Sequence, residues 1–252
     1  MLFLISPTKT MKQDGKRKPT SIPVFIEKTK IITKVIQQYT QEELQDLMKI
    51  KEPLAIQVKR QFESILFDEY GTSAIETYDG LQFKYMNIST LNESDLEYIL
   101  QHVRILSGFY GIVKPMDSIY PYRLEMQTKM SVDEHKNLYE YWENVIVEEI
   151  QKEIKNHTCS YVINLASKEY DKAIRKRMSG ENFIDVIFQV EKKGKRKVEA
   201  TASKMARGKM IRFAAQHKIE RVEQLYEFCE DGYCLDQNLT NQQQIVFYKI
   251  VE

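Results

Sequence analysis

Short apolar runs alternate with longer polar stretches along this chain. Residues 2–5 (LFLI) and 161–165 (YVINL) are apolar runs bounded by polar or turn-forming residues, a pattern typical of buried central strands. Residues 28–38, 42–48 and 138–154 are predicted to be helices. Another helix is predicted for residues 53–66, because proline is tolerated in the first helical turn. This alternation predicts an α/β fold.

Two more helices and four more strands follow from local signals. Ser94 and Glu97 have the spacing of a capping box, which predicts a helix that starts there and stops near Gly108. A further helix is predicted for residues 170–177. The remaining strands are predicted at residues 184–190 and 197–202, as a β-hairpin, and at residues 232–236 and 245–251.

The expected architecture is a single compact domain over residues 1–252. Neither a Pro/Gly/Ser-rich linker nor an internal repeat interrupts the chain. We therefore expect mixed α+β structure, with a mixed, partly antiparallel sheet surrounded by helices. The first ten residues have too few apolar positions for a signal peptide, and no apolar run approaches the ~18 residues of a membrane span. A cytoplasmic location without a membrane partner is expected, and three cysteines suit a reducing compartment.

The net charge of +1 conceals an uneven distribution along the chain. Residues 172–218 contain 14 Lys and Arg against 4 Asp and Glu, whereas residues 37–100 contain 12 acidic against 5 basic residues. If the basic stretches meet on one face, they form a positive groove that attracts anions. The alternative is a solvated basic hairpin and helix face.

Four separated segments combine small, aromatic and basic residues beyond what core packing requires. They are residues 2–10 (LFLISPTKT), 106–126 (LSGFYGIVKPMDSIYPYRLEM), 163–170 (INLASKEY) and 204–213 (KMARGKMIRF). Together they resemble the YaaA family of bacterial proteins associated with resistance to peroxide stress. One departure is Thr8, where the family motif ISPAKT has alanine. The resemblance implies DNA binding and protection that limits the free iron driving oxidation of DNA and protein.

Polar side chains follow two of the predicted strands. Lys9 comes just after residues 2–5, whereas Asn164 and Ser167 lie at and beyond the end of residues 161–165. Strand ends are where α/β proteins place their sites, and Ser167 is positioned to cap the next helix, whose free N–H groups would attract an anion. A plain helix cap and a solvated surface lysine are the alternatives.

The segment of residues 106–126 alternates rings with charges. Tyr110, Arg123 and Glu125 are its candidate site residues. In an extended segment Arg123 and Glu125 share a face, so they either form a salt bridge or leave Arg123 to bind a phosphate or carboxylate. The glycines lack a dinucleotide fingerprint and no P-loop is present. Neither ATP nor NAD is implied, and no cofactor is predicted.

Residues 203–218 are predicted to form an amphipathic helix with a basic outer face. Lys204, Arg207 and Arg212 fall on that face. Gly208 interrupts the helix at a cost of roughly 1 kcal/mol relative to alanine, which indicates close packing at that point. Basic residues of this kind bind phosphates without reading sequence.

Residues 40–62 (TQEELQDLMKIKEPLAIQVKRQF) resemble a helix-hairpin-helix module, which binds the DNA backbone. Both glycines expected in the hairpin are replaced, by Lys49 and Lys51, whose side chains are expected to substitute for backbone amides. Ordinary packing of two helices is the alternative. The basic residues assigned to DNA here are Lys49, Lys51, Lys59 and Arg60.

Metal and thiol chemistry have weak sequence signals. The four histidines lack the spacing of a metal site, and Cys229 and Cys234 form neither a zinc knuckle nor a CxxC pair. Glu230 and Asp231 would disfavour a Cys229 thiolate, so direct reduction of peroxide by thiols is not expected.

The sequence thus predicts a peroxide-stress protein that binds double-stranded DNA non-specifically through the phosphate backbone. The alternative is an enzyme whose basic pocket acts on a small anionic or nucleotide-like substrate, and a pure interaction protein is a third hypothesis. The candidate residues of that pocket are Lys9, Tyr110, Arg123, Glu125, Asn164, Ser167, Lys204 and Arg207.

Overall fold

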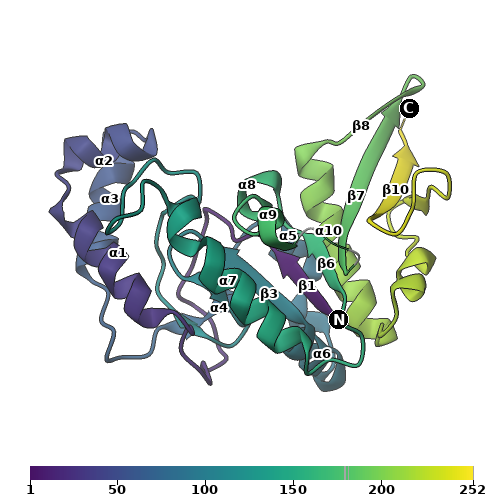
Figure 1. Cartoon of the computed structure of the whole chain (residues 1–252), viewed down its shortest axis with the longest axis horizontal. Coiled ribbons are helices and arrows are strands. Elements are labelled where there is room, and N and C mark those ends of the chain that lie inside the picture. The colour runs from purple at the N-terminus through teal and green to yellow at the C-terminus, as the bar shows by residue number, and fades with distance from the viewer. Residues whose placement is uncertain (179, 181, 252) are drawn as a thin grey trace.

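The computed structural model describes residues 1–178, 180 and 182–251 (Figure 1). Within these residues, eight strands form one sheet in the order β4-β3-β1-β6-β7-β10-β9, with β8 paired to β7. The parallel strands are β1 (Leu2–Ile5), β3 (Val103–Ser107), β6 (Val162–Leu165), β7 (Phe183–Lys192) and β10 (Gln244–Ile250). The antiparallel strands are β4 (Gly111–Val113), β8 (Lys195–Lys197) and β9 (Cys234–Leu235). The predicted mixed α/β class with a partly antiparallel sheet is confirmed.

Helices and a small second sheet surround these strands. The longer helices are α1 (Ile26–Gln38), α2 (Gln41–Met48), α3 (Glu52–Glu63), α6 (Glu93–His102), α7 (Leu138–Ile154) and α10 (Ala200–His217). The shorter helices are α4 (Ala74–Thr77), α5 (Leu81–Met86), η1 (Ile88–Thr90), α8 (Lys168–Asp171), α9 (Arg175–Met178) and η2 (Val222–Glu227). The second sheet pairs β2 (Thr72–Ser73) with β5 (Ser118–Ile119). No helix in the described part of the chain is both long and apolar enough to span a membrane.

The centre of the main sheet is buried on both faces. Every residue of β1, β3 and β6 is buried, which explains why the sequence of β1 is a continuous apolar run and why Asn164 is the one polar residue of β6. β1 pairs with β3 on one side and with β6 on the other. The chain therefore adds β3 beside β1 and then crosses to the opposite side of β1, which creates a topological switch point between β1 and β6.

The predicted helix from Ser94 is wrong at both ends. Asn92 caps α6, because its side chain accepts a hydrogen bond from the backbone N–H of Asp95 at 2.8 Å. The helix ends at His102, and residues 103–107 form β3. This apolar stretch fits either a helix or a buried strand, and its pairing with β1 decides the outcome.

Two other predicted elements also differ. Strand β8 ends at Lys197 and α10 begins at Ala200, so residues 200–202 are helical and not part of a hairpin strand. The turn itself lies where it was expected, with Lys193 and Gly194 in the left-handed region at φ 50° and 73°. The helix predicted at residues 170–177 is divided into α8 and α9.

Helix α10 lies against α5 at the one position where it has no side chain. A Cβ atom on Gly208 would be 2.1 Å from the carbonyl oxygen of Gln82 and 2.9 Å from the backbone nitrogen of Met86. The close packing predicted at Gly208 is therefore confirmed. On the other side of α10, Ala206, Met210, Phe213 and Ala214 are buried, as the amphipathic pattern predicts.

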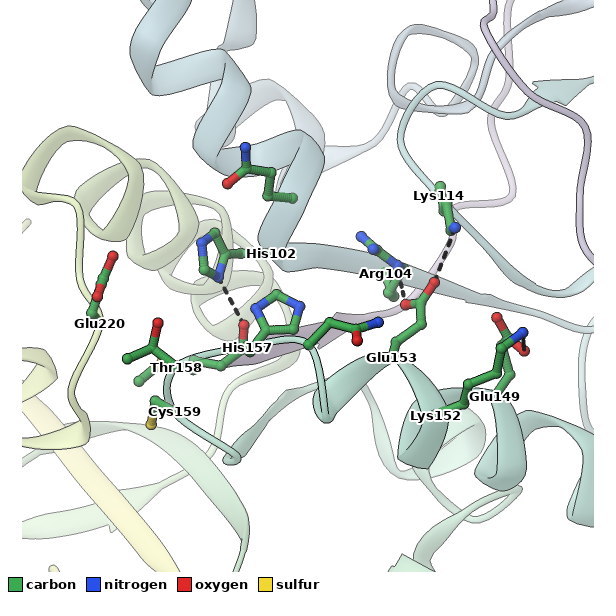
Figure 2. A pocket seen from close by; sticks show the side chains of 13 residues that line it. His102, Arg104, Lys114, Glu149, Lys152, Glu153, His157, Thr158, Cys159 and Glu220 are labelled. Carbon is green, nitrogen blue, oxygen red and sulfur yellow. Dashed lines mark hydrogen bonds and ion pairs between the residues drawn. The ribbon is translucent and has the colours of Figure 1, made fainter.

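A cavity of about 500 Å³ lies at the amino-terminal edge of the parallel strands (Figure 2). We call it the amino-edge cavity. One ring nitrogen of His102 is hydrogen-bonded to the carbonyl oxygen of Met1 at 2.8 Å, and the His102 and His157 rings are 5.0 Å apart. Burial lowers the pKa of His157 to about 4 and also lowers the pKa of His102. Both imidazoles are therefore neutral at pH 7.

Gly208→Ala should destabilise the fold by roughly 1–3 kcal/mol, because the added methyl group overlaps backbone atoms of α5. Urea unfolding would measure this loss. Gln216→Ala is the matched control, since Gln216 is exposed on the same helix and its replacement should change the free energy of unfolding by no more than about 0.5 kcal/mol. Equal effects of the two substitutions would contradict the close approach.

Stability should fall as the pH is lowered from 6.5 towards 4, with His157 contributing. The folded-state pKa of about 4 lies below the ordinary value of 6.5, so the unfolded chain takes up the proton first and unfolding becomes easier through this range. His157→Gln should reduce the pH dependence of the unfolding midpoint, whereas the same change at exposed His217 should not. An unchanged slope in His157→Gln would refute this assignment.

Candidate functional site

A pocket of about 450 Å³ opens at the carboxyl ends of β1 and β6, at the topological switch point. We call it the strand-end pocket. Residues 6–10 and 167–170 extend from the two strands into its wall, and residues 79–84 and 122–125 close other sides. The candidate residues that line it are Lys9, Arg123, Glu125, Ser167, Lys204 and Arg207.

Two serines join the strand ends within the pocket. The hydroxyl of Ser6 accepts a hydrogen bond from the backbone N–H of Ser167 at 2.8 Å and donates one to the Ser167 hydroxyl at 3.3 Å. Ser167 precedes α8, but its side chain makes no capping hydrogen bond. The predicted N-cap position of Ser167 is therefore confirmed, but its side chain does not cap the helix, and its hydroxyl accepts a hydrogen bond from Ser6 instead.

Lys9, Arg123 and Glu125 form a charged cluster on the pocket wall. The Nζ atom of Lys9 lies 2.8 Å from Oε1 of Glu125, and Nη2 of Arg123 lies 3.3 Å from the same oxygen. The predicted contact between Arg123 and Glu125 is present. Arg123 still has a buried Nε atom without a hydrogen-bond partner. One carboxylate therefore holds two cations and leaves a buried donor of Arg123 unpaired among the described residues.

Tyr122 joins this wall to the core. Its hydroxyl lies 2.6 Å from the Ser107 hydroxyl and 3.0 Å from that of Tyr78. Ser107 accepts hydrogen bonds from the backbone N–H groups of Phe109 and Tyr110. Burial raises the pKa of Tyr122 to about 12, so the hydroxyl stays protonated at neutral pH. This chain of hydrogen bonds positions Arg123 and Glu125.

Arg207 reaches the pocket from α10. Its Nε atom is buried without a hydrogen-bond partner, and burial lowers its pKa although a guanidinium remains charged. The negative charges of Asp171 and Asp185 act in the opposite direction and favour the charged form of Arg207. Both are already bound by Arg175, at 2.6 Å and 2.7 Å. Arg207 is therefore a buried cation without a dedicated counter-ion among the described residues.

Three buried hydrogen-bond donors in this pocket have no acceptor among the residues that the structure describes. They are Nε2 of Gln82, Nε of Arg123 and Nε of Arg207. Buried polar groups in folded proteins are nearly always hydrogen-bonded, so unpaired donors that line one concavity indicate a missing acceptor. An anion or a carbonyl-rich ligand supplies such acceptors.

The amino-edge cavity has a different chemistry although its volume is similar. Glu153 is bound there by Arg104 at 2.5 Å and by Lys114 at 3.2 Å (Figure 2). None of the unpartnered buried side-chain atoms found in the described residues belongs to its lining. The strand-end pocket is therefore the better candidate site.

Glu169 adds a second carboxylate to the strand-end pocket. Burial raises its pKa, and the charge of Glu125 contributes in the same direction. Glu125, by contrast, is fixed by Lys9 and Arg123. The pocket thus contains one carboxylate that accepts a proton more readily than usual beside one that is held by cations, an arrangement suited to general acid–base chemistry.

Two of the eight predicted pocket residues, and the predicted DNA-binding residue Arg212, lie outside the pocket lining. Asn164 is buried at the end of β6, where its amide donates to Asp185 at 2.7 Å and its carbonyl accepts from the N–H of Ala166 at 3.0 Å. Tyr110 is buried in the core, and its hydroxyl accepts from the N–H of Tyr120. Arg212 donates to the carbonyl oxygens of Met86 and Asn87 at the carboxyl end of α5.

The basic residues predicted on the outer face of α10 have different partners. Arg212 is engaged with the end of α5, and Lys218 lies 2.5 Å from Asp95. Other basic residues of the segment 172–218 are paired locally, as Arg196 is with Glu191 at 2.7 Å. Only Lys204 and Arg207 of the α10 candidates face the pocket.

The predicted DNA-binding residues of the segment 40–62 lie elsewhere. Helices α2 and α3, which we call the α2–α3 hairpin, form one end of the molecule in Figure 1, away from α10. Lys49 has φ 55° and ψ 51°, the left-handed conformation that glycine favours. Lys49, Lys51 and Arg60 are exposed, whereas Lys59 donates to the carbonyl oxygens of Gln37 and Tyr39.

Sequence reasoning missed Ser6, Gln82 and Glu169. Ser6 and Glu169 lie inside the singled-out segments, and a polar residue directly after a buried strand was a usable signal for Ser6. Gln82 gave no signal, because its importance comes from burial beside Gly208. Across the part of the chain that the structure describes, no three His, Cys, Asp or Glu side chains form a group able to hold a metal ion.

Known proteins of this kind match the chain over nearly its whole length. The sequence model of the family described as "Peroxide stress protein YaaA" matches residues 1–239. A UPF0246 protein of Clostridioides difficile (strain 630) is 43% identical over 251 residues, covering 99% of this chain and 100% of the relative. A UPF0246 protein of Desulfitobacterium hafniense (strain Y51) is 38% identical over 251 residues, covering 99% and 98%. The chain belongs to the YaaA family of peroxide stress proteins.

Proposed function

We propose that this protein acts in the response to peroxide stress by binding a small anionic, nucleotide-like ligand in the strand-end pocket. Its family is that of the peroxide stress proteins, which supports the cellular role. The observation that carries the ligand proposal is the set of three buried donors without acceptors in one pocket. A phosphate or carboxylate offers several acceptor oxygens to such donors.

The charges of the pocket favour an anion over a neutral ligand. Arg207 is desolvated and lacks a counter-ion among the described residues, so an anion that reaches it offsets the cost of its burial. Lys204 lies beside it on the same wall and is exposed, forming no ion pair with a described residue. These two cations mark the expected position of the anionic group.

The rest of the lining suits a planar or apolar part of the ligand. Leu81, Phe83, Leu124 and Tyr170 line the pocket together with the charged groups. Binding sites for small molecules combine such apolar walls with a few polar groups that fix the orientation. Glu169, with its raised pKa, can exchange a proton with a bound ligand. A nucleotide-like anion therefore fits better than a free inorganic ion.

Arg207→Met should raise the stability of the ligand-free protein by about 1–2 kcal/mol, because it removes a buried charge without a partner. The same substitution should abolish the increase in melting temperature caused by adenosine monophosphate. Thermal unfolding with and without the nucleotide measures both effects. Lys129→Met is the control, since Lys129 is exposed and lies outside the pocket.

The comparison of three probes tests the ligand class. Adenosine monophosphate should bind more tightly than inorganic phosphate, and adenosine should bind least, as measured by calorimetric titration. An Arg207→Met variant that binds the nucleotide with unchanged affinity would disprove this site. Loss of stability in ligand-free Arg207→Met would mean that Arg207 serves the fold and not a ligand.

A second function, non-specific binding of duplex DNA, is proposed for the α2–α3 hairpin. Lys49 and Lys51 are exposed on its three-residue connection, at one end of the molecule. The left-handed conformation of Lys49 supports this proposal. The backbone at this position has the conformation that glycine favours, and the lysine side chain adds a positive charge. Shielding of DNA from iron-driven oxidation is the protective effect that this proposal includes.

Replacing Lys49 and Lys51 together by alanine should weaken duplex binding and reduce the slope of log affinity against log salt concentration by roughly 2, about 1 for each lost phosphate contact. Fluorescence anisotropy at several salt concentrations would measure it. Alanine at both Lys129 and Lys155, which are exposed elsewhere, is the control of equal charge. Equal slopes for the two double variants would exclude the α2–α3 hairpin as the DNA-binding site.

The Lys49→Gly variant distinguishes the contribution of the Lys49 side chain to DNA binding from that of the backbone. Glycine should stabilise the left-handed position by up to about 1 kcal/mol. If the lysine side chain contacts phosphate, DNA affinity falls although stability rises. Unchanged affinity in Lys49→Gly would assign the contact to backbone amides instead.

A further inference from the structure

Cys229 and Cys234 lie at the two ends of a tight turn that leads into β9. Their sulfur atoms are 3.9 Å apart and both residues are exposed. The other cysteine, Cys159, is partly buried in the lining of the amino-edge cavity. The five-residue separation of the pair does not match a CxxC motif, so only the turn brings the two thiols together.

The backbone holds both ends of this turn in place. Asp231 and Gly232 take left-handed conformations at φ 57° and 78°, and the N–H of Tyr233 donates to the carbonyl oxygen of Glu230 at 3.0 Å. Cys234 pairs with Tyr248 of β10. On the other side, Phe228 is buried against Phe188, Phe213 and Phe247. The short distance between the sulfurs is thus maintained by strand pairing and by core packing.

The acidic neighbours of Cys229 are less repulsive than the sequence indicates. The carboxylate of Asp231 lies 2.8 Å from Nζ of Lys249 and 3.5 Å from Nζ of Lys209, so much of its negative charge is neutralised. The contact with Cys229 raises the pKa of the Cys234 thiol. Cys234 therefore keeps its proton to higher pH than an ordinary thiol.

We propose that Cys229 and Cys234 are a modification site at which hydrogen peroxide closes an intramolecular disulfide. In the first step the Cys229 thiolate attacks one oxygen of the peroxide, and the O–O bond breaks. The departing hydroxide takes a proton and becomes water, leaving a sulfenic acid on Cys229. The Cys234 sulfur then attacks the Cys229 sulfur, the S–O bond breaks, and a second water leaves. Two thiols and one peroxide thus become one disulfide and two waters, with two electrons passing from sulfur to oxygen.

Closing the bond requires only a local change. The sulfurs must move from 3.9 Å to the bonded distance of about 2.05 Å. Both side chains are exposed, so rotation about their Cα–Cβ bonds meets little packing resistance. The bond closes a short loop and should therefore stabilise the fold only slightly. Its chemical effect is to protect Cys229 from further oxidation, since the resolving thiol is already in place.

The reduced full-length protein, treated with an equimolar amount of hydrogen peroxide and then with N-ethylmaleimide, tests the proposal by mass spectrometry. We expect one maleimide label, on Cys159, in place of three, and a peptide in which Cys229 and Cys234 are joined. Dithiothreitol should restore all three labels. In Cys234→Ser, dimedone should trap a sulfenic acid on Cys229, because no partner resolves it. Cys159→Ser should form the same disulfide as the unmodified chain.

Three results would overturn the proposal. One is full labelling of all three cysteines after peroxide treatment, and another is a disulfide that includes Cys159. The third is a product that consists of sulfinic acid on Cys229 or of dimers linked between chains. Circular dichroism checks that each variant is folded. If a variant does not fold, the labelling result with the unmodified chain still tests the proposal.

Discussion

The burial of β1 between β3 and β6 is the constraint on which the rest of the structure depends. Because all four of its residues are buried, β1 presents polar groups only beyond its ends. The two cavities described above lie at those two ends. At the amino-terminal edge the polar groups satisfy one another, as Arg104 and Lys114 do with Glu153. At the carboxyl edge three buried donors have no acceptor among the described residues, and the proposed ligand is placed there for that reason.

The central strands could be predicted from sequence because their burial leaves a direct mark. A continuous apolar run identifies β1, and an apolar run broken only by Asn164 identifies β6. Residues 103–107 are nevertheless predicted to be helical, because they continue the apolar pattern of α6. Whether these residues form a helix or a strand depends on pairing with β1. Local periodicity carries no information about a partner strand about a hundred residues away in the sequence. The break between α8 and α9 likewise had no clear local marker.

The candidate site was predictable where residues follow strand ends and unpredictable where burial decides. Lys9 and Ser167 lie after β1 and β6, and the structure brings both into one pocket with Arg123 and Arg207. Tyr110 also lies in a segment that mixes rings, glycines and charges, but its side chain is buried in the core, where its hydroxyl accepts a hydrogen bond from the backbone N–H of Tyr120. Gln82 shows the reverse case, since an ordinary-looking residue on a short helix becomes an unpaired donor.

Two of the contacts that α10 makes with α5 also bear on the rigidity of the pocket. Gly208 lies against Gln82 near the start of α5, and Arg212 binds the carbonyl oxygens at its end. Held at both ends, α5 should move with α10 as one rigid body, so Gln82 and Arg207 keep a fixed spacing. On the opposite wall, Ser6 is hydrogen-bonded to Ser167 and Lys9 is paired with Glu125. A ligand would therefore meet Gln82 and Arg207 on a preformed surface, with little reorganisation of the pocket on binding.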